Sequence, residues 1–137
     1  MIRKAKNKDA ESIHNLICIF SETGNVLFRS LDEINKNISS FWVYEKDDRV
    51  VGTYNLKRGW GRLVELRSLA VNPRYSRQGI GTKMIKASIE EALSTECDEL
   101  FVLTYVVSMF KTIGFSTVDK ETPVYYTHLT LPTIYSV

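Results

Sequence analysis

A glycine-rich segment near the middle of the chain has the residue types that hold an anion. Its parts, in order, are the alternating strand pattern Leu63–Val71, then Pro73, Arg77, Gly79 and Gly81, with a helical pattern directly after them. Glycines let the backbone approach a ligand without an intervening Cβ. The first turn of a helix has N–H groups without intrahelical acceptors and carries partial positive charge. The segment therefore predicts a cradle for a pyrophosphate, beside the formal charge of Arg77.

Two other interpretations of the glycine pair compete with this one. A strand-to-helix junction often carries glycine for tight packing alone, so Gly-x-Gly by itself is weak evidence. A Rossmann dinucleotide site needs three glycines within a βαβ unit, and an acidic residue about twenty positions later. Only two glycines are present here, and the segments before them have the pattern of consecutive strands. The order of strand, proline, basic residues, Gly-x-Gly and amphipathic helix favours the anion cradle.

Hydrophobic periodicity predicts the elements that must position this turn. Directly after it, one face of a helix packs on a sheet, through the apolar positions Ile80, Met84, Ile85, Ile89, Ala92 and Leu93. The other predicted helices cover residues 9–20, 30–37 and 107–113, and the predicted strands cover 2–5, 41–45, 50–56, 63–71, 100–105 and 114–119. This pattern predicts an α+β fold with an α/β/α layering, whose first strands form an antiparallel meander.

Composition limits the class of protein. With 137 residues, 44% apolar content and a formal net charge of +2, the chain is expected to fold as one soluble core. Its dispersed cations give no reason to expect nucleic acid, and the absence of a long apolar run or signal peptide predicts a cytoplasmic protein without a membrane partner. Cys18 and Cys97 lack metal-ligand spacing, so we expect free thiols and no metal.

Two short runs in the glycine-rich segment resemble the acetyl-CoA-binding signature of the GCN5-related N-acetyltransferases, the GNAT family. They are Leu69-Ala70-Val71 and Arg77-Gln78-Gly79-Ile80-Gly81, with Thr82 next. The resemblance covers nearly the whole chain, from Ile2 to about Tyr125. It implies a GNAT fold, with a mixed, mostly antiparallel sheet of about six strands that splays between the fourth and fifth, flanked by about four helices.

The same resemblance implies how coenzyme A is held. The strand backbone pairs with the pantetheine arm, and the turn amides hold the pyrophosphate. One position departs from the family, because Ser76 stands where Gln or Arg is usual, three residues before the first glycine. Since backbone N–H groups make most of such a cradle, we expect the serine to weaken the site rather than to abolish it.

Acetyl transfer to an amine needs a base, because amines are mostly protonated at neutral pH. The resemblance makes Glu65 the candidate base, acting directly or through a water, because some family members carry a glutamate at the matching strand position. The alternative is a solvated carboxylate or one paired with Arg67 on the same strand face. A strand amide near Leu69 or Ala70 is expected to stabilise the oxyanion.

The general acid is less clearly marked. The family often has a tyrosine in the helix before the Gly114-Phe115 pair, but this chain has Phe110 there. Tyr105, at the end of the fifth predicted strand, is therefore the candidate catalytic acid, with Ser108 as the other nearby hydroxyl. The alternative for Tyr105 is a tyrosine that only anchors the strand.

A second resemblance narrows the acceptor. Further runs are similar to the short single-domain bacterial N-acetylglutamate synthases of arginine biosynthesis, namely 65–71, 101–105, Phe110, Gly114-Phe115 and 118–120. It implies transfer of the acetyl group to the α-amine of L-glutamate. A dianionic acceptor needs cations, and Arg67 beside Ser68 is the first candidate to bind it, followed by Arg29 and Lys111. The alternative for Arg67 is an ion pair with Glu65.

Two other functions stay open for a chain with this signature. One is an acetyltransferase of the same fold that acts on another amine, such as a polyamine, an antibiotic or a protein amino terminus. The other is a non-catalytic domain that senses acyl-CoA. In each case the partner is a small molecule or a protein amine, and a homodimer remains open.

The last residues do not follow the family pattern. Residues 126–137 resemble the translation of a sequencing-library adapter, so we expect an acetyltransferase domain over 1–125, truncated at its carboxy terminus, and then a non-native tail. His128 within the tail is not expected to be catalytic. The competing interpretation is a native terminal strand. Residues 127–131 also have enough β propensity to pair with the sixth strand by accident.

Overall fold

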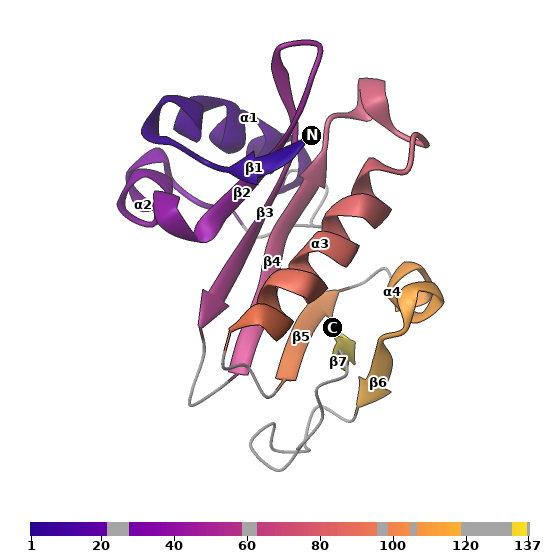
Figure 1. Ribbon diagram of the computed structural model, residues 1–137. Helices are drawn as coiled ribbons and strands as arrows, with labels where there is room; N and C mark the ends of the chain where they lie inside the picture. The colour runs from indigo at the N-terminus through magenta and orange to yellow at the C-terminus, as the bar shows by residue number, and fades with distance from the viewer. Residues whose placement is uncertain (22–27, 59–62, 96–98, 105–106, 119–132, 137) are drawn as a thin grey trace. The chain divides into compact units, whose positions relative to one another are not determined.

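The computed structural model describes residues 1–21, 28–58, 63–95, 99–104, 107–118 and 133–136 (Figure 1). The helices are α1 (Ala10–Ser21), α2 (Leu31–Lys36), α3 (Ile80–Ser94) and α4 (Val107–Ile113), with 3₁₀ turns η1 (Asn7–Asp9), η2 (Ile38–Ser40) and η3 (Pro73–Tyr75). The strands are β1 (Ile2–Lys4), β2 (Phe41–Lys46), β3 (Arg49–Arg58), β4 (Leu63–Val71), β5 (Glu99–Thr104), β6 (Ser116–Val118) and β7 (Thr133–Ser136). The predicted α+β class is confirmed. The described residues contain the four expected helices and one strand beyond the expected six.

The hydrogen-bonded strand order is β1-β2-β3-β4-β5-β7-β6. Contacts divide the chain into two units, one made of Met1–Asn55 and Ser68–Met84 and the other of Leu56–Arg67 and Ile85–Val137. Strands β3 and β4 and helix α3 therefore each contribute residues to both units.

The first unit is built on an antiparallel ladder of β1, β2 and β3. The β2–β3 register runs from Phe41 opposite Asn55 to Lys46 opposite Arg49, with a bulge after Tyr44. The two residues of the connecting turn, Asp47 and Asp48, have left-handed φ angles of 54° and 59°. Such a pair is typical of the tight hairpin turn whose twist matches that of the strands, and aspartate tolerates this conformation better than most residues.

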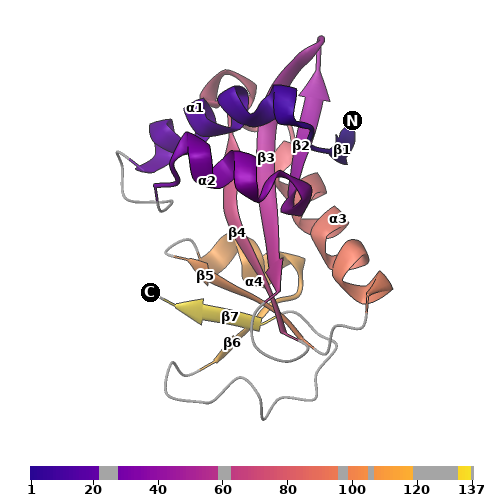
Figure 2. The same cartoon turned by 90° about the vertical axis from the view of Figure 1, so that its left-hand side faces the viewer.

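Helices pack on both faces of this ladder. In Figure 2, α1 and α2 lie on one side of β2 and β3, and their core consists of Ala5, Ala10, Ile13, Ile17, Ile34, Phe41 and Val43. The start of α3 contacts the other side at Gly52, where an added Cβ would lie 2.9 Å from Met84 Cε and 3.4 Å from Ile80 Cγ2. The absence of a side chain at Gly52 thus lets α3 approach the strand closely.

The start of α2, within the predicted helix over 30–37, has a side-chain cap. The Ser30 hydroxyl accepts a hydrogen bond from the backbone N–H of Glu33 at 3.1 Å. The Glu33 carboxylate pairs with the Arg29 guanidinium at 3.3 Å. The loop and helix are therefore joined by one cap and one ion pair.

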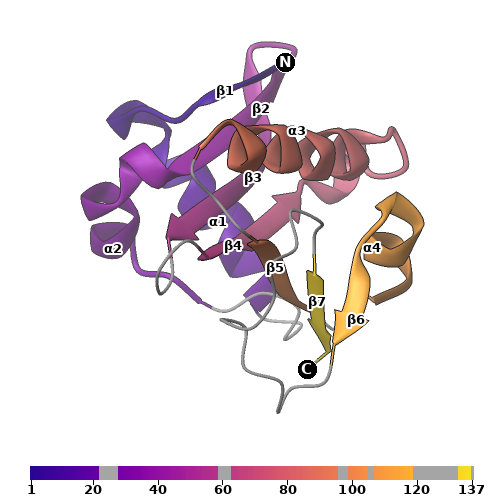
Figure 3. The same cartoon turned by 60° about the horizontal axis from the view of Figure 1, so that its bottom comes forward.

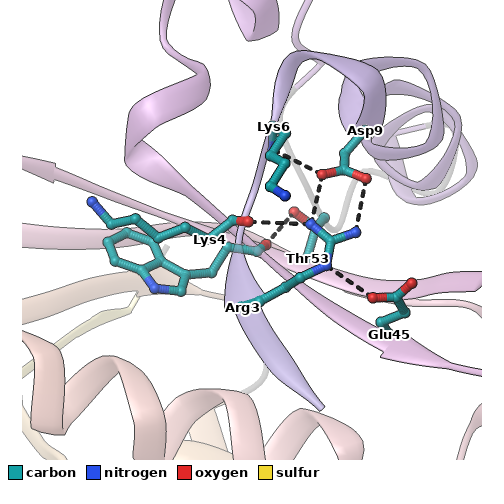
Figure 4. A network of polar contacts seen from close by, with 7 residues as sticks. Arg3, Lys4, Lys6, Asp9, Glu45 and Thr53 are labelled. Carbon is teal, nitrogen blue, oxygen red and sulfur yellow. Dashed lines mark hydrogen bonds and ion pairs between the residues drawn. The ribbon is translucent and has the colours of Figure 1, made fainter.

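A charged network joins the amino terminus to the ladder (Figure 4). Arg3 on β1 donates from its two terminal nitrogens to the two carboxylate oxygens of Asp9, at 2.8 and 3.0 Å. Its Nε donates to Glu45 on β2 at 2.9 Å, while Asp9 also accepts from the backbone N–H of Lys6 at 2.8 Å. Asp9 is buried, so the bidentate pair compensates a charge held away from water.

The second unit contains parallel pairs. β4 pairs with β5 from Leu63 opposite Glu99 to Leu66 opposite Val102, and β7 pairs in parallel with both β5 and β6. Figure 3 shows β5, β7 and β6 side by side, with α4 next to β6. The predicted chance pairing of residues 127–131 lies outside the described residues. Within the described residues, Thr133–Ser136 pairs with β6.

The end of α4 shows why Phe110 occupies its position. Phe110 and Phe115 are buried, and their rings meet edge to face with centroids 5.2 Å apart. The backbone N–H of Phe115 donates to the carbonyl of Phe110, and Gly114 between them has a φ of 119°. Gly114 therefore ends the helix as predicted, and Phe110 is a core residue.

One predicted core position on α3 is wrong. Ile80, Met84, Ile85 and Ala92 are buried, but Leu93 is 54% exposed. At 3.6 residues per turn, Leu93 lies about 100° around the helix from Ala92 and leaves the buried stripe near the end of the helix. In the part of the chain that the structure describes, every helix is too short or too polar to cross a bilayer.

The Arg3 network predicts how stability depends on pH. The hydrogen bond from Arg3 lowers the pKa of Asp9 below its ordinary value of 3.8. Stability from this carboxylate is therefore fully present above that ordinary value and is lost as pH falls through the lower pKa of the folded protein. We expect Asp9→Asn to reduce the free energy of unfolding by roughly 2 kcal/mol at neutral pH, because hydrogen bonds between charged groups are strong.

Urea unfolding of both proteins from about pH 7 to about pH 2.5 measures this effect. The gap between wild type and Asp9→Asn should shrink as Asp9 becomes protonated. Asp48→Asn, an exposed change of the same type, should leave wild-type behaviour intact. A gap that stays constant over this pH range would contradict the assignment.

Candidate functional site: the turn between β4 and α3

The link between β4 and α3 is held to the neighbouring strand at its start. The backbone N–H of Asn72, just after β4, donates to the carbonyl of Val51 on β3 at 2.7 Å. The Asn72 side chain then accepts from the N–H of Arg74 at 2.9 Å and caps η3, whose first residue is Pro73. A side-chain cap and a proline in the first turn both favour a tight 3₁₀ turn here. The start of the link is therefore well defined.

The end of the link has an unusual backbone conformation. Arg77 and Gly79 have left-handed φ angles of 62° and 78°, with Gln78 between them. Alternation of this kind turns successive N–H groups toward one concave side, which is an arrangement that binds anions. A non-glycine residue in this region is costly, so surrounding contacts must support Arg77.

Helix α3 adds further donors directly after this turn. Its first hydrogen bond runs from the N–H of Lys83 to the carbonyl of Gly79, at 3.0 Å. By helix geometry, the N–H groups of Ile80, Gly81 and Thr82 therefore have no acceptor within the helix. The first turn of α3 carries no acidic side chain. These donors and the helix dipole favour an anion at this end.

The two glycines of the turn have different reasons to be glycine. Gly79 needs its left-handed φ, and a Cβ there would meet no atom within 4 Å. Gly81 has no such φ, and its Cβ would have only an ordinary contact with Val71 Cγ2 at 3.9 Å. Neither backbone conformation nor packing therefore requires glycine at position 81. The residue instead leaves open space beside the free amides of α3.

The turn has cations around it. Arg74, Arg77 and Lys83 are exposed along the link and the first turn of α3. Gln78 is also exposed, and its Oε1 accepts a hydrogen bond from Lys46 Nζ at the tip of the β2–β3 hairpin, at 2.5 Å. Positive charge at the turn thus comes from two separate parts of the sequence.

The pairing and the backbone conformation of strand β4 change along its length. Its pairs with β5 end at Leu66, and the strand continues to Val71, so residues 67–71 lie beyond that ladder. Ser68 is buried with a left-handed φ of 57°, which interrupts the regular pleat. Glu65 and Arg67 are half-buried and, being two residues apart, lie on the same face of the strand before this interruption.

The other predicted site residues divide between described and undescribed parts. Leu69 and Val71 are half-buried on β4, and Ala70 is buried between them. Lys111 is exposed on α4, and the Arg29 side chain is 17% exposed before α2. Tyr105, the predicted acid, lies outside the described residues.

Similarity to known proteins decides the family. The model of the acetyltransferase (GNAT) family matches residues 9–115, which is most of the chain. The chain belongs to this family. Its fold and its class as an acetyl-CoA-dependent N-acetyltransferase, predicted from the β4–α3 signature, are thereby confirmed.

Individual GNAT relatives support the assignment. An uncharacterized N-acetyltransferase of Chlorobaculum tepidum is 32% identical over 121 residues, which are 88% of this chain and 77% of the relative. An amino-acid acetyltransferase of Mycobacterium tuberculosis is 30% identical over 128 residues, covering 90% and 72%. The structure of N-acetylglutamate synthase from Neisseria gonorrhoeae with coenzyme A and N-acetyl-glutamate matches with a TM-score of 0.84 and 29% identity, over 92% of this chain but only 30% of that one.

Two features of this GNAT site were not predicted from the sequence. Lys46 is separated from Gln78 by 32 positions, and no local pattern relates them. Ser68 has a left-handed φ inside an otherwise regular strand pattern, and a serine in such a pattern does not predict this conformation. The hairpin that carries Lys46 lies between the predicted strands 41–45 and 50–56, and turns of this kind favour aspartate.

The two glycines predict opposite effects on stability. Gly81→Ala should raise the free energy of unfolding by about 0.5 to 1 kcal/mol, because alanine favours helix and the position has room. It should also weaken coenzyme A binding about tenfold, a loss of about 1.4 kcal/mol, by filling the space beside the amides. Gly79→Ala should lower stability by about 1 kcal/mol because of its φ.

Urea unfolding and calorimetric titration with coenzyme A provide the two measurements. A Gly81→Ala protein that is more stable and binds coenzyme A as tightly as wild type would show that this space is not used by the cofactor.

Proposed function

We propose that this GNAT protein transfers the acetyl group of acetyl-CoA to the α-amine of an amino acid, with L-glutamate as the first acceptor. The relatives named as amino-acid acetyltransferases support this acceptor class. The chain spans only 27% of the Vibrio cholerae member of that group. The proposal therefore concerns transfer by this domain alone.

In this proposal, coenzyme A binds along β4 and the turn that follows. The amides of residues 77–82 hold the pyrophosphate, since the left-handed turn and the first turn of α3 leave these donors available. The backbone of Leu69, Ala70 and Val71, beyond the ladder with β5, pairs with the pantetheine arm. Ser76 is exposed and extended, and its N–H bonds to Pro73, so it shapes the turn mainly through its backbone.

The chemical step needs a base and a polarised carbonyl. The neutral amine attacks the thioester carbon, the carbon–sulfur bond breaks, and coenzyme A leaves as the thiolate. We assign removal of the amine proton to Glu65, directly or through a water. An amide at Leu69 or Ala70 would stabilise the oxyanion. Tyr105 is proposed to protonate the thiolate.

The burial and pairing of the Arg29 guanidinium are the main support for an acidic acceptor. Its side chain is mostly buried, and its one ion pair on the described residues is with Glu33 at 3.3 Å. Its Nε is buried without a hydrogen-bond partner among the described residues. A buried donor on a charged group is costly to leave unpaired, so a carboxylate ligand would complete this site.

Arg67 and Ser68 remain proposed acceptor ligands on β4. Their positions follow directly after Glu65 along the strand. A guanidinium and a hydroxyl can both donate to a carboxylate, so the pair suits a dicarboxylic amino acid.

A panel of acceptors with acetyl-CoA tests the function. We expect the highest kcat/KM for glutamate, lower values for glutamine and leucine, and little transfer to spermidine or a peptide amino terminus. Arg29→Met should raise the KM for glutamate about tenfold, since a charge-assisted bidentate contact is lost, and should leave the rate with a neutral amino acid nearly unchanged.

A preference for spermidine or the peptide would contradict the glutamate assignment. Binding of coenzyme A without transfer to any amine would indicate a sensor.

The base assignment makes a separate prediction. Glu65→Gln should reduce kcat by about 10² to 10⁴-fold, the usual contribution of a general base, while coenzyme A binding stays close to wild type. The loss should become smaller at high pH, where more of the amine is already deprotonated. Measurements of kcat for wild type and Glu65→Gln at a series of pH values test both effects.

Glu90→Gln, an exposed change on α3, is the matched control and should behave as wild type. Unchanged turnover in Glu65→Gln would remove Glu65 from the mechanism.

A further inference from the structure

The β2–β3 hairpin contacts the turn between β4 and α3, residues 72–79, at two points. Lys46 Nζ donates to Gln78 Oε1, and the carbonyl of Val51 accepts from the N–H of Asn72. These contacts lie near the two ends of the link from β4 to α3. The hairpin therefore meets both the start and the end of the segment that presents the amides.

Gln78 is the residue of the turn that most needs such a contact. It stands between two left-handed residues, so its two peptide units are the ones whose orientation makes the turn concave. Because left-handed Arg77 carries a steric cost, the conformation depends on outside support. Lys46 supplies a charge-assisted hydrogen bond from a residue 32 positions away.

Lys46 is itself held in a defined place. It pairs with Arg49 across the hairpin, and the tight turn between them consists of the left-handed Asp47 and Asp48. Its ammonium has three N–H donors, and one of them is used on Gln78. The other two N–H donors are not used on Gln78.

We propose that Lys46 is a positioning residue for the phosphates of coenzyme A, acting through Gln78. By holding the Gln78 side chain, it keeps the concave turn formed. This role rests on the proposed binding of the cofactor at the turn. It should affect recognition of the phosphates and leave the acetyl-transfer step unaffected.

The test compares Lys46→Met with Lys46→Arg and with Lys57→Met. Lys57 is an exposed lysine near the other end of β3, so its substitution removes the same charge away from the turn. For Lys46→Met we expect the Kd of coenzyme A and the KM of acetyl-CoA to rise about threefold to fivefold, the size of an exposed charged contact, with kcat unchanged. Lys46→Arg should retain most of the affinity, and Lys57→Met all of it.

A fragment of the cofactor distinguishes a loss of phosphate recognition from a general loss of cofactor binding. Pantetheine lacks the pyrophosphate and the adenosine, so its affinity for Lys46→Met should equal that for wild type. The double variant Lys46→Met/Gln78→Ala should bind coenzyme A no more weakly than Gln78→Ala alone, because the two side chains act as one unit.

Three results would overturn the proposal. They are wild-type affinity of Lys46→Met for coenzyme A, an equal loss for pantetheine, and additive losses in the double variant. Failure of the wild-type protein to bind coenzyme A would instead reject the proposed function on which this inference rests.

Discussion

The close packing of α3 on β3 at Gly52 is the constraint on which the turn between β4 and α3 depends. Met84 and Ile80, near the start of the helix, occupy the space where a side chain at position 52 would be. The start of α3 is therefore fixed against the same strand that receives the hydrogen bond from Asn72. The short link from Val71 to Ile80 must then fold tightly, and η3 and the two left-handed residues accomplish this. Packing of an apolar face thus determines where polar amides are presented.

The sequence predicted the parts of this arrangement that depend on local pattern. Helical periodicity located α3, alternation located β4, and the predicted helix over 30–37 contains α2. The glycine signature indicated the family because glycine has few substitutes where backbone must turn or face a ligand. The prediction that Leu93 is a core residue was wrong because periodicity assigns a face to every apolar residue. This includes a residue at the edge of the buried stripe where the helix ends.

Contacts between distant parts of the chain could not be predicted in this way. Lys46 meets Gln78 only because the register of β2 and β3 and the packing of α3 bring the hairpin to the turn. Arg29 was one of several cations in the sequence. Its burial, and an Nε without a partner among the described residues, distinguish it only in three dimensions. The left-handed φ of Ser68 has no residue signature. The roles of Glu65, Arg67 and Tyr105 remain predictions.

In the proposed function, the turn between β4 and α3 combines two kinds of positive potential that respond differently to the solution. The backbone amides of the turn and of α3 are neutral dipoles in fixed positions, and mobile ions screen them little at contact distance. Arg74, Arg77 and Lys83 are exposed full charges, whose attraction over longer distances falls within a Debye length of about 8 Å at physiological ionic strength. Added salt should therefore slow the arrival of a polyanion more than it loosens one already seated. In a cell, the exposed cations would govern the association rate of a polyanion at the turn, and the amides would govern its dissociation rate.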